Sequence, residues 1–109
     1  MVTLANTQNL SQFELHARAV TGIPVESIEL LKKGASAVIL ASDTNDSFPN
    51  ISGLDLASKY KNTDYKIFGK PSSKPYRRMG VALAYSSCGE STSFLVNEAK
   101  KVASSIKVK

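Results

Sequence analysis

The sequence has one cysteine, no tryptophan and no long apolar run, and each of these shortages excludes a class of protein. A lone thiol, Cys88, leaves no internal disulfide and no Cys-rich metal site. Every apolar stretch is shorter than the roughly 20 residues that a membrane-spanning helix needs. Residues 1–10 have neither a basic start nor an apolar centre, so they lack the pattern of a secretory signal. These features predict a cytoplasmic protein with no membrane partner.

Acidic residues are nearly missing from residues 59–78, although the whole chain is only moderately basic. This segment carries seven basic side chains and the single acid Asp64, while the 109 residues together have a formal net charge of +5. Clustered positive charge favours an anionic partner. The same pattern also suits a solvated, Lys-rich surface, and charge alone does not separate these two interpretations.

Two helices are predicted from their start signals and spacing. Ser11 and Glu14 have the spacing of a capping box, in which each side chain satisfies a backbone N–H at the start of a helix. This helix ends at Gly22, and its apolar stripe consists of Leu10, Phe13, Ala17 and Val20. A second helix is predicted over residues 92–106, with a buried stripe of Leu95, Ala99, Val102 and Ile106. Lys107 stands at its C-terminal end, where the helix dipole favours cations.

Strand patterns occur at residues 1–4, 35–41, 64–68 and 79–85. The run at 35–41 is apolar and bounded by turn residues, which predicts a buried strand. In the last strand Met79, Val81, Leu83 and Tyr85 share one face, and the small residues between them allow close approach on the other. Residues 42–53 are predicted as a loop and 54–60 as a short helix. The chain is therefore predicted to be a single α+β domain over residues 1–109, a small, mostly antiparallel sheet with packed helices.

No catalytic or metal-binding constellation is visible in the sequence. There is no nucleophile–base pair, no zinc spacing and no Gly-rich phosphate loop of the usual form. Asp43 and Asp46 lie in a polar segment and are predicted as turn formers. The single histidine, His16, has no ligand-type residues at metal spacing and is predicted at the surface. We therefore expect no catalytic residue and no metal ligand in this chain.

Lys70, Arg77 and Arg78 are the residues whose types and spacing best suit a binding site, in this case for an anion. They lie at the two ends of a loop between predicted strands, so the fold is expected to bring them together. An Arg fork fits two phosphate oxygens at once, and Lys adds a mobile point charge. From the residues alone, phosphate binding and plain surface charge are equally supported.

Around this loop the sequence resembles one enzyme family. Residues 68–71 read Phe-Gly-Lys-Pro, and residues 77–84 read Arg-Arg-Met-Gly-Val-Ala-Leu-Ala. Together they resemble a signature of formate-dependent phosphoribosylglycinamide transformylases, which belong to the ATP-grasp superfamily. Residues 1–4, 9–13 and 35–40 are similar to the same enzymes in the same order. The spacer at residues 72–76 differs from the more acidic, Gly-containing versions typical of the family.

The resemblance implies a role in de novo purine synthesis. In the family, ATP activates formate and the amine of glycinamide ribonucleotide attacks it, with magnesium as cofactor. Lys70, Arg77 and Arg78 match the positions that hold the ribonucleotide. The magnesium-binding acids precede residue 1 in these enzymes, so we expect no activity from this chain alone and no ATP or magnesium bound to it. Residues 1–41 would end the grasp C-lobe, residues 62–106 would form a hairpin and helix, and a homodimer is expected.

Two other functions are considered. The carboxylating ATP-grasp enzyme of purine synthesis, a carboxyaminoimidazole ribonucleotide synthetase, shares the architecture but is not expected to share the residue 68–71 and 77–84 motifs. A basic nucleic-acid-binding module would need aromatic residues interleaved with the cations on an open sheet. The candidates for that role are Tyr60, Tyr65, Phe68 and Tyr76.

Overall fold

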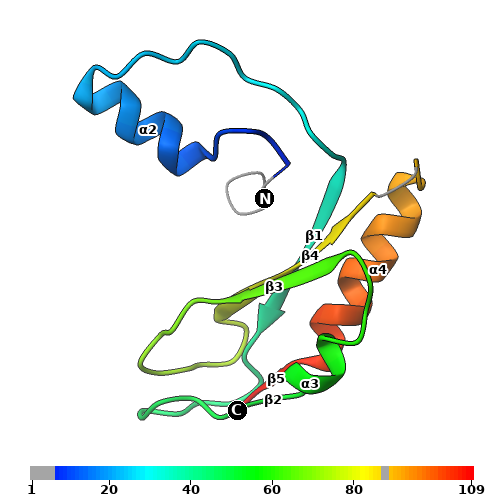
Figure 1. The fold of residues 1–109 in the computed structure, drawn as a ribbon. Coiled ribbons are helices and arrows are strands. Elements are labelled where there is room, and N and C mark those ends of the chain that lie inside the picture. Colours follow the sequence, from blue (N-terminus) through cyan, green and yellow to red (C-terminus); the bar gives the residue numbers. More distant parts are fainter. Residues whose placement is uncertain (1–6, 87–88) are drawn as a thin grey trace.

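The computed structural model describes residues 7–86 and 89–109. The strand predicted at residues 1–4 and the thiol of Cys88 lie outside the described residues. The elements in chain order are α2 (Gln12–Thr21), β1 (Gly34–Leu40), β2 (Ile51–Ser52), α3 (Leu54–Ala57), β3 (Thr63–Ile67), β4 (Arg78–Tyr85), α4 (Thr92–Ser105) and β5 (Lys107–Val108) (Figure 1). None of the helices in the described part of the chain has the length and apolar character that crossing a membrane requires.

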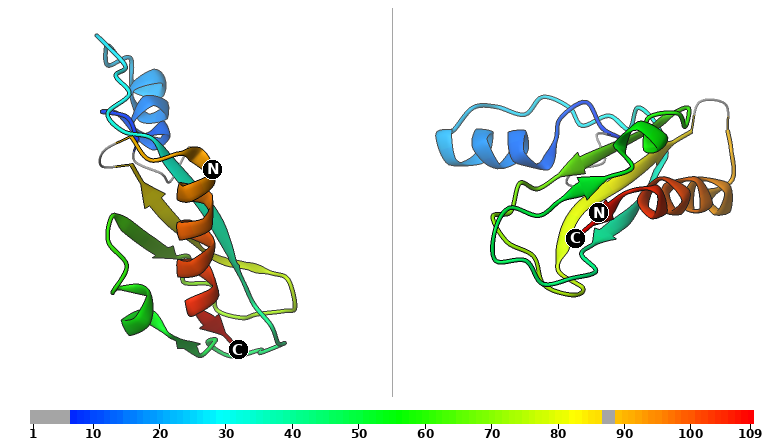
Figure 2. Two further views of the ribbon diagram at one scale, coloured as in Figure 1. Left: turned by 90° about the vertical axis from the view of Figure 1, so that its right-hand side faces the viewer. Right: turned by 90° about the horizontal axis from the view of Figure 1, so that it is seen from below.

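The sheet confirms the predicted α+β class. Three strands pair antiparallel in the order β1-β4-β3, and the short strands β2 and β5 form a separate antiparallel pair. Helix α4 runs along one face of the three-stranded sheet (Figure 2). Strand β4 lies between its two neighbours, which explains why Ala82, Leu83 and Ala84 are almost completely buried.

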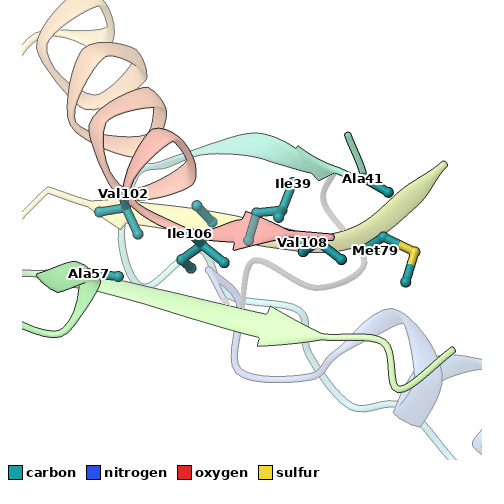
Figure 3. Close-up of a cluster of buried hydrophobic side chains, with 8 residues drawn as sticks. Ile39, Ala41, Ala57, Met79, Val102, Ile106 and Val108 are labelled. Atoms are coloured by element: carbon teal, nitrogen blue, oxygen red, sulfur yellow. The ribbon is translucent and has the colours of Figure 1, made fainter. Parts of the chain in front are cut away.

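The main core lies between α4 and the sheet. Ala99 and Leu95 pack against Ala84, and Val102 belongs to a second cluster that includes Ala82 and Ile39. Small residues on this side of β4 let the helix come close, as predicted from the alternation of the strand. Figure 3 shows how this second cluster gathers side chains from β1, α3, β4, α4 and β5 and from the residues that directly follow β1 and α4: Ile39, Ala41, Ala57, Met79, Val102, Ile106 and Val108.

The prediction that Met79 shares a face of β4 with Val81, Leu83 and Tyr85 is wrong for Met79. Val81, Leu83 and Tyr85 do form one cluster on the face away from α4. Met79 instead joins the core cluster beneath α4. The reason is an irregular register, because Ile39 pairs with Gly80 while the next β1 residue pairs with Arg78, which leaves one extra residue in β4. A bulge reverses the alternation, and a period-2 pattern cannot reveal it.

Strand β1 was predicted as buried, and this is only half right. Ile39 is 1% exposed, but its neighbours Val38 and Leu40 are 45% and 41% exposed. Strand β1 is at one end of the strand order, and α4 covers only one of its faces. An apolar run therefore does not distinguish a strand buried on both faces from one that leaves a face uncovered.

The two short strands correct the predictions for the loop and for the last helix. The segment predicted as loop at 42–53 contains β2, which pairs with β5. Helix α4 ends at Ser105, so Lys107 lies in β5 and does not cap the helix. The short helix predicted over 54–60 covers only Leu54–Ala57. Two-residue strands paired across more than fifty positions leave no local periodicity to detect.

Helix α2 forms as predicted but does not pack as an amphipathic helix. The Ser11–Glu14 capping box is present, and Gly22 closes the helix in the left-handed conformation. The predicted apolar stripe is not buried, because Phe13 is 63% and Val20 is 70% exposed and α2 has no buried residue. Figure 1 shows α2 standing apart from the sheet, joined to it by an extended segment that leads into β1.

Candidate functional site

The loop between β3 and β4, residues 68–77, is anchored to the neighbouring loop by backbone and side-chain bonds. The amide of Ser73 donates to the carbonyl of Asn45 at 2.8 Å, and the amide of Asn45 donates back to Ser73 at 3.0 Å. Ser73 is fully buried, and its hydroxyl donates to the carbonyl of Asp43 at 3.0 Å. These bonds hold the middle of the basic loop in place. Asp43 therefore has a structural role, in agreement with its prediction as a turn residue.

A strained turn precedes the two arginines. Tyr76 has φ 65°, a left-handed conformation that is uncommon for a residue with a side chain. Its amide donates to the carbonyl of Ala41 at 3.0 Å, and the amide of Ala41 donates to the carbonyl of Arg77 at 2.9 Å. The amide of Arg77 in turn donates to Lys74 at 2.9 Å. The end of β1 thus fixes the backbone from which Arg77 and Arg78 project.

Arg78 borders a hollow of about 110 Å³ on the sheet face opposite α4. The lining residues come from β1, from β4 and from the residue that follows β3: Ser36, Val38, Phe68, Arg78, Gly80 and Val81. Val38 and Phe68 belong to its apolar wall, and both are partly exposed, at 45% and 37%. The hollow is several times larger than the roughly 30 Å³ that one water occupies in the liquid. It therefore has room for part of a small ligand beside a guanidinium group.

Phe68 is near both Lys70 and the hollow that Arg78 lines. The Nζ of Lys70 is 5.8 Å from the centre of the Phe68 ring, within the range of a cation–π contact. Phe68 and Arg78 both line the hollow. Arg77 has a different environment, because its Nη1 donates to the Ser72 hydroxyl at 3.0 Å and to the Ser72 carbonyl at 3.4 Å. Phe68 thus lies within cation–π distance of Lys70 and lines the same hollow as Arg78. Arg77 instead stabilises the loop through its hydrogen bonds to Ser72.

The three cations are not neutralised by acids of the described chain. Over residues 7–86 and 89–109, the ion pair within 4.0 Å is that of Lys101 and Glu98 on α4, where Glu98 also raises the pKa of Lys101. Lys70, Arg77 and Arg78 therefore have no carboxylate partner among the described residues and are available to an anionic ligand. Phosphate and carboxylate groups are the ligands that such a cluster attracts best.

The hollow's apolar wall contains residues that sequence reasoning missed. Phe68 was considered as part of the Phe-Gly-Lys-Pro motif and as a possible stacking residue for nucleic acid, but not as a ligand contact in a substrate site, and Val38 was considered only as part of a strand. The signal for Phe68 was its position at the end of β3 directly before Gly69 and Lys70. Tyr60 and Tyr65 pack against the core cluster and are partly buried, whereas Tyr76 is 83% exposed. Two of the four aromatic candidates for a nucleic-acid surface therefore take part in core packing.

Comparison with known proteins identifies the class first. The chain superimposes on N5-carboxyaminoimidazole ribonucleotide synthetase from Thermotoga maritima with a TM-score of 0.80 and 26% sequence identity, over 94% of this chain and 28% of that one. That enzyme belongs to the ATP-grasp class. The small α+β fold with its basic β3–β4 loop is therefore the fold of one part of an ATP-grasp enzyme.

The particular family follows from the sequence comparisons. A family model described as "PurT, C-terminal" matches residues 34–106, and the chain belongs to this family. It is 52% identical over 109 residues to the formate-dependent phosphoribosylglycinamide formyltransferase of Chlorobium phaeobacteroides, and 48% identical over 108 residues to that of Flavobacterium psychrophilum. The chain spans 27% and 28% of the length of these two relatives. The carboxylating alternative is not favoured, because the family model and these relatives are those of the formyltransferase.

Proposed function

We propose that this chain supplies the ribonucleotide-binding wall of a formate-dependent phosphoribosylglycinamide formyltransferase. Its membership of the PurT C-terminal family supports this role, since curated relatives carry that name. The observation that carries the proposal is the cation arrangement around the hollow, where Arg78 lines the wall and Lys70 lies over the ring of Phe68. An unneutralised cluster of this kind suits the phosphate of phosphoribosylglycinamide.

The three cations have distinct roles in this proposal. Arg78 borders the hollow and presents a planar fork, so it binds two phosphate oxygens. Lys70 adds a mobile positive charge within cation–π distance of the Phe68 ring. Arg77 already uses one guanidinium nitrogen on Ser72, so it fixes the loop and offers its remaining N–H groups to the ligand. The chain's part in catalysis is to bind and orient the substrate that carries the attacking amine.

ATP and magnesium enter the proposal through the family, not through residues of this chain. Within residues 7–86 and 89–109, no group of three or more His, Cys, Asp or Glu is placed to hold a metal ion. We assign ATP and magnesium to parts of the enzyme that this chain does not span. We place the enzyme in the cytoplasm, where ATP is supplied to soluble biosynthetic enzymes.

The test uses a full-length formyltransferase that carries these residues as its C-terminal segment. Arg78→Ala should raise the KM for phosphoribosylglycinamide about 10- to 150-fold, because a lost charge-assisted contact costs about 1.5–3 kcal/mol. The KM for ATP should change less than twofold. Lys59→Ala is the matched control, since it removes an exposed charge from the same basic segment without touching the hollow. An equal loss of ATP affinity in Arg78→Ala would contradict the proposed role.

A homodimer is a second part of the proposal, and the exposed side of β1 supports it. Strand β1 is an edge of the described sheet, and it carries the exposed residues Val38 and Leu40. Apolar edge strands favour pairing with a second copy. Light scattering of the 109-residue chain over a tenfold concentration range should show a mean molar mass that rises towards twice the monomer mass. Val38→Lys should reduce this rise, because it places a charge on the exposed side of β1. A constant monomer mass at every concentration would contradict this part.

A further inference from the structure

Phe68 occupies an unusual position for a large apolar side chain. It follows the last residue of β3, and its amide donates to the carbonyl of Met79 at 2.9 Å, so its backbone is fixed to β4. Its ring is nevertheless 37% exposed and lines the hollow beside Arg78. A partly exposed ring on a fixed backbone, near Lys70 and beside the hollow that Arg78 lines, is well placed to contact a ligand.

The chemistry of the hollow goes beyond what a phosphate group needs. Phosphate is bound by cations and N–H groups and gains nothing from an apolar wall. Here the guanidinium of Arg78 stands beside an apolar surface formed by Val38, Phe68 and Val81. Ligand sites generally combine such apolar walls with a few polar groups that fix orientation. The arrangement therefore fits a ligand in which an anionic group is joined to a compact part with apolar C–H surface.

We infer that Phe68 is a specificity-determining residue that packs against the pentose ring of the ribonucleotide while Arg78 binds its phosphate. This inference rests on the proposed function and adds a contact to the sugar. The C–H face of a pentose offers the apolar surface that the ring of Phe68 can cover. The same ring keeps the Lys70 ammonium within cation–π distance of its face, so one side chain serves the sugar and the cation that flanks it.

The experiment compares two ligands in the full-length enzyme that carries this segment. Titration calorimetry measures binding of phosphoribosylglycinamide, which contains the pentose, and of inorganic phosphate, which does not. Phe68→Ala should weaken the first about tenfold, as expected for losing roughly half of the burial of a Phe side chain. Phosphate affinity should stay within twofold. Phe94→Ala is the matched control, because Phe94 is a half-exposed phenylalanine on α4 away from the hollow.

Two further variants make the outcomes distinct. Phe68→Tyr keeps the ring and should retain the affinity for phosphoribosylglycinamide, whereas Phe68→Leu should lose part of it even if Phe68→Ala does not fold. An equal loss for both ligands in Phe68→Ala would overturn the inference, because the ring would then act only on Lys70 or on the loop. Failure of the proposed function looks different, since Arg78→Ala would then leave both affinities unchanged.

Discussion

The molecule has two regions that differ in whether their apolar side chains are buried or exposed. In the body, from β1 onwards, apolar side chains from all five strands and from α3 and α4 form the core clusters. In the arm, residues 7–31, no described residue is buried. Seven large apolar side chains of the arm are at least 40% exposed: Phe13, Val20, Ile23, Val25, Ile28, Leu30 and Leu31. The first buried residue of the described chain is Ile39, close to residue 34, where the match to the family model begins.

Local polar bonds hold the arm in shape without a core. Arg18 donates from Nη1 to the carbonyl of Pro24 at 2.9 Å, and the amide of Glu29 donates to the side-chain oxygen of Asn9 at 2.8 Å. Directly after the arm, the Lys32 ammonium lies 3.8 Å from the centre of the Tyr85 ring, and the amide of Ser86 donates to the carbonyl of Lys33 at 2.9 Å. Burial, and after it the nearby Asp64 charge, raises the pKa of Tyr85, so its hydroxyl stays neutral at physiological pH. Helix α2 therefore forms with its capping bonds although no core packing stabilises it.

The largest expected difference is between two isoleucines. Ile39 is 1% exposed and Ile28 is 55% exposed. Ile39→Ala should lower the free energy of unfolding by about 2–5 kcal/mol through lost burial and a cavity. Ile28→Ala should change it by less than about 0.5 kcal/mol. Urea unfolding of the 109-residue chain measures both. Similar losses from the two variants would show that the arm buries Ile28 in solution, for instance against a second copy.

Two glycines give a smaller contrast of the same kind. Gly53 has φ 86° and Gly22 has φ 72°, so alanine is strained at both. A Cβ at Gly53 would also collide with the carbonyl oxygen of Ser105, whereas a Cβ at Gly22 would meet nothing within 4 Å. Gly53→Ala should therefore cost about 2–4 kcal/mol, the sum of backbone strain and overpacking.

The Gly22 variant serves as the control for conformation alone. Gly22→Ala should destabilise the helix of the arm by about 1–2 kcal/mol. The reason is that Gly22 ends α2 in the left-handed conformation, in which its amide donates to the carbonyl of Arg18. Thermal unfolding of the body should be nearly unchanged, while circular dichroism should lose part of the helical signal. A large shift of the body's Tm in Gly22→Ala would mean that the two regions unfold as one unit.

The sequence was informative where a structural rule is local and uninformative where it depends on distant residues. The Ser11–Glu14 spacing correctly predicted the capping box, and the small residues of β4 correctly predicted the approach of α4. The exposure of Phe13 was not predictable, because helical spacing shows that an apolar stripe exists but not what covers it. The displaced Met79 needed the pairing register, which no single strand contains.

The candidate site shows the same limit. Lys70, Arg77 and Arg78 were found because their residue types and the motif around them are visible in the sequence. The separation of their roles was not visible, since the contact of Arg77 with Ser72 and the position of Arg78 at the hollow depend on the folded loop. Val38 lies in the hollow only because β1 and β3 flank β4, a neighbourhood that topology decides.

The smallest expected effect concerns the pH at which α2 loses its cap. Glu14 accepts a hydrogen bond from the Ser11 amide at 2.7 Å. That backbone bond, and after it the Ser11 hydroxyl, hold the pKa of Glu14 below its usual value. A carboxylate with a lowered pKa in the folded state stabilises that state above its unfolded pKa, and this contribution is lost as pH falls through the folded pKa. The arm should therefore lose helix in acid while the body keeps its structure.

NMR titration of the backbone amides can separate the two regions. As pH falls below the usual range of a glutamate, amides of residues 11–21 should shift towards disordered values, and amides of β4 should not. Glu14→Gln keeps the geometry of the capping box and should remove this pH dependence. Ser11→Ala should lower the helical population of α2 at every pH, since a lost cap costs about 1 kcal/mol. If β4 amides shifted in step with α2, the arm and the body would share one stability, because the exposed arm would then be packed against the sheet in solution.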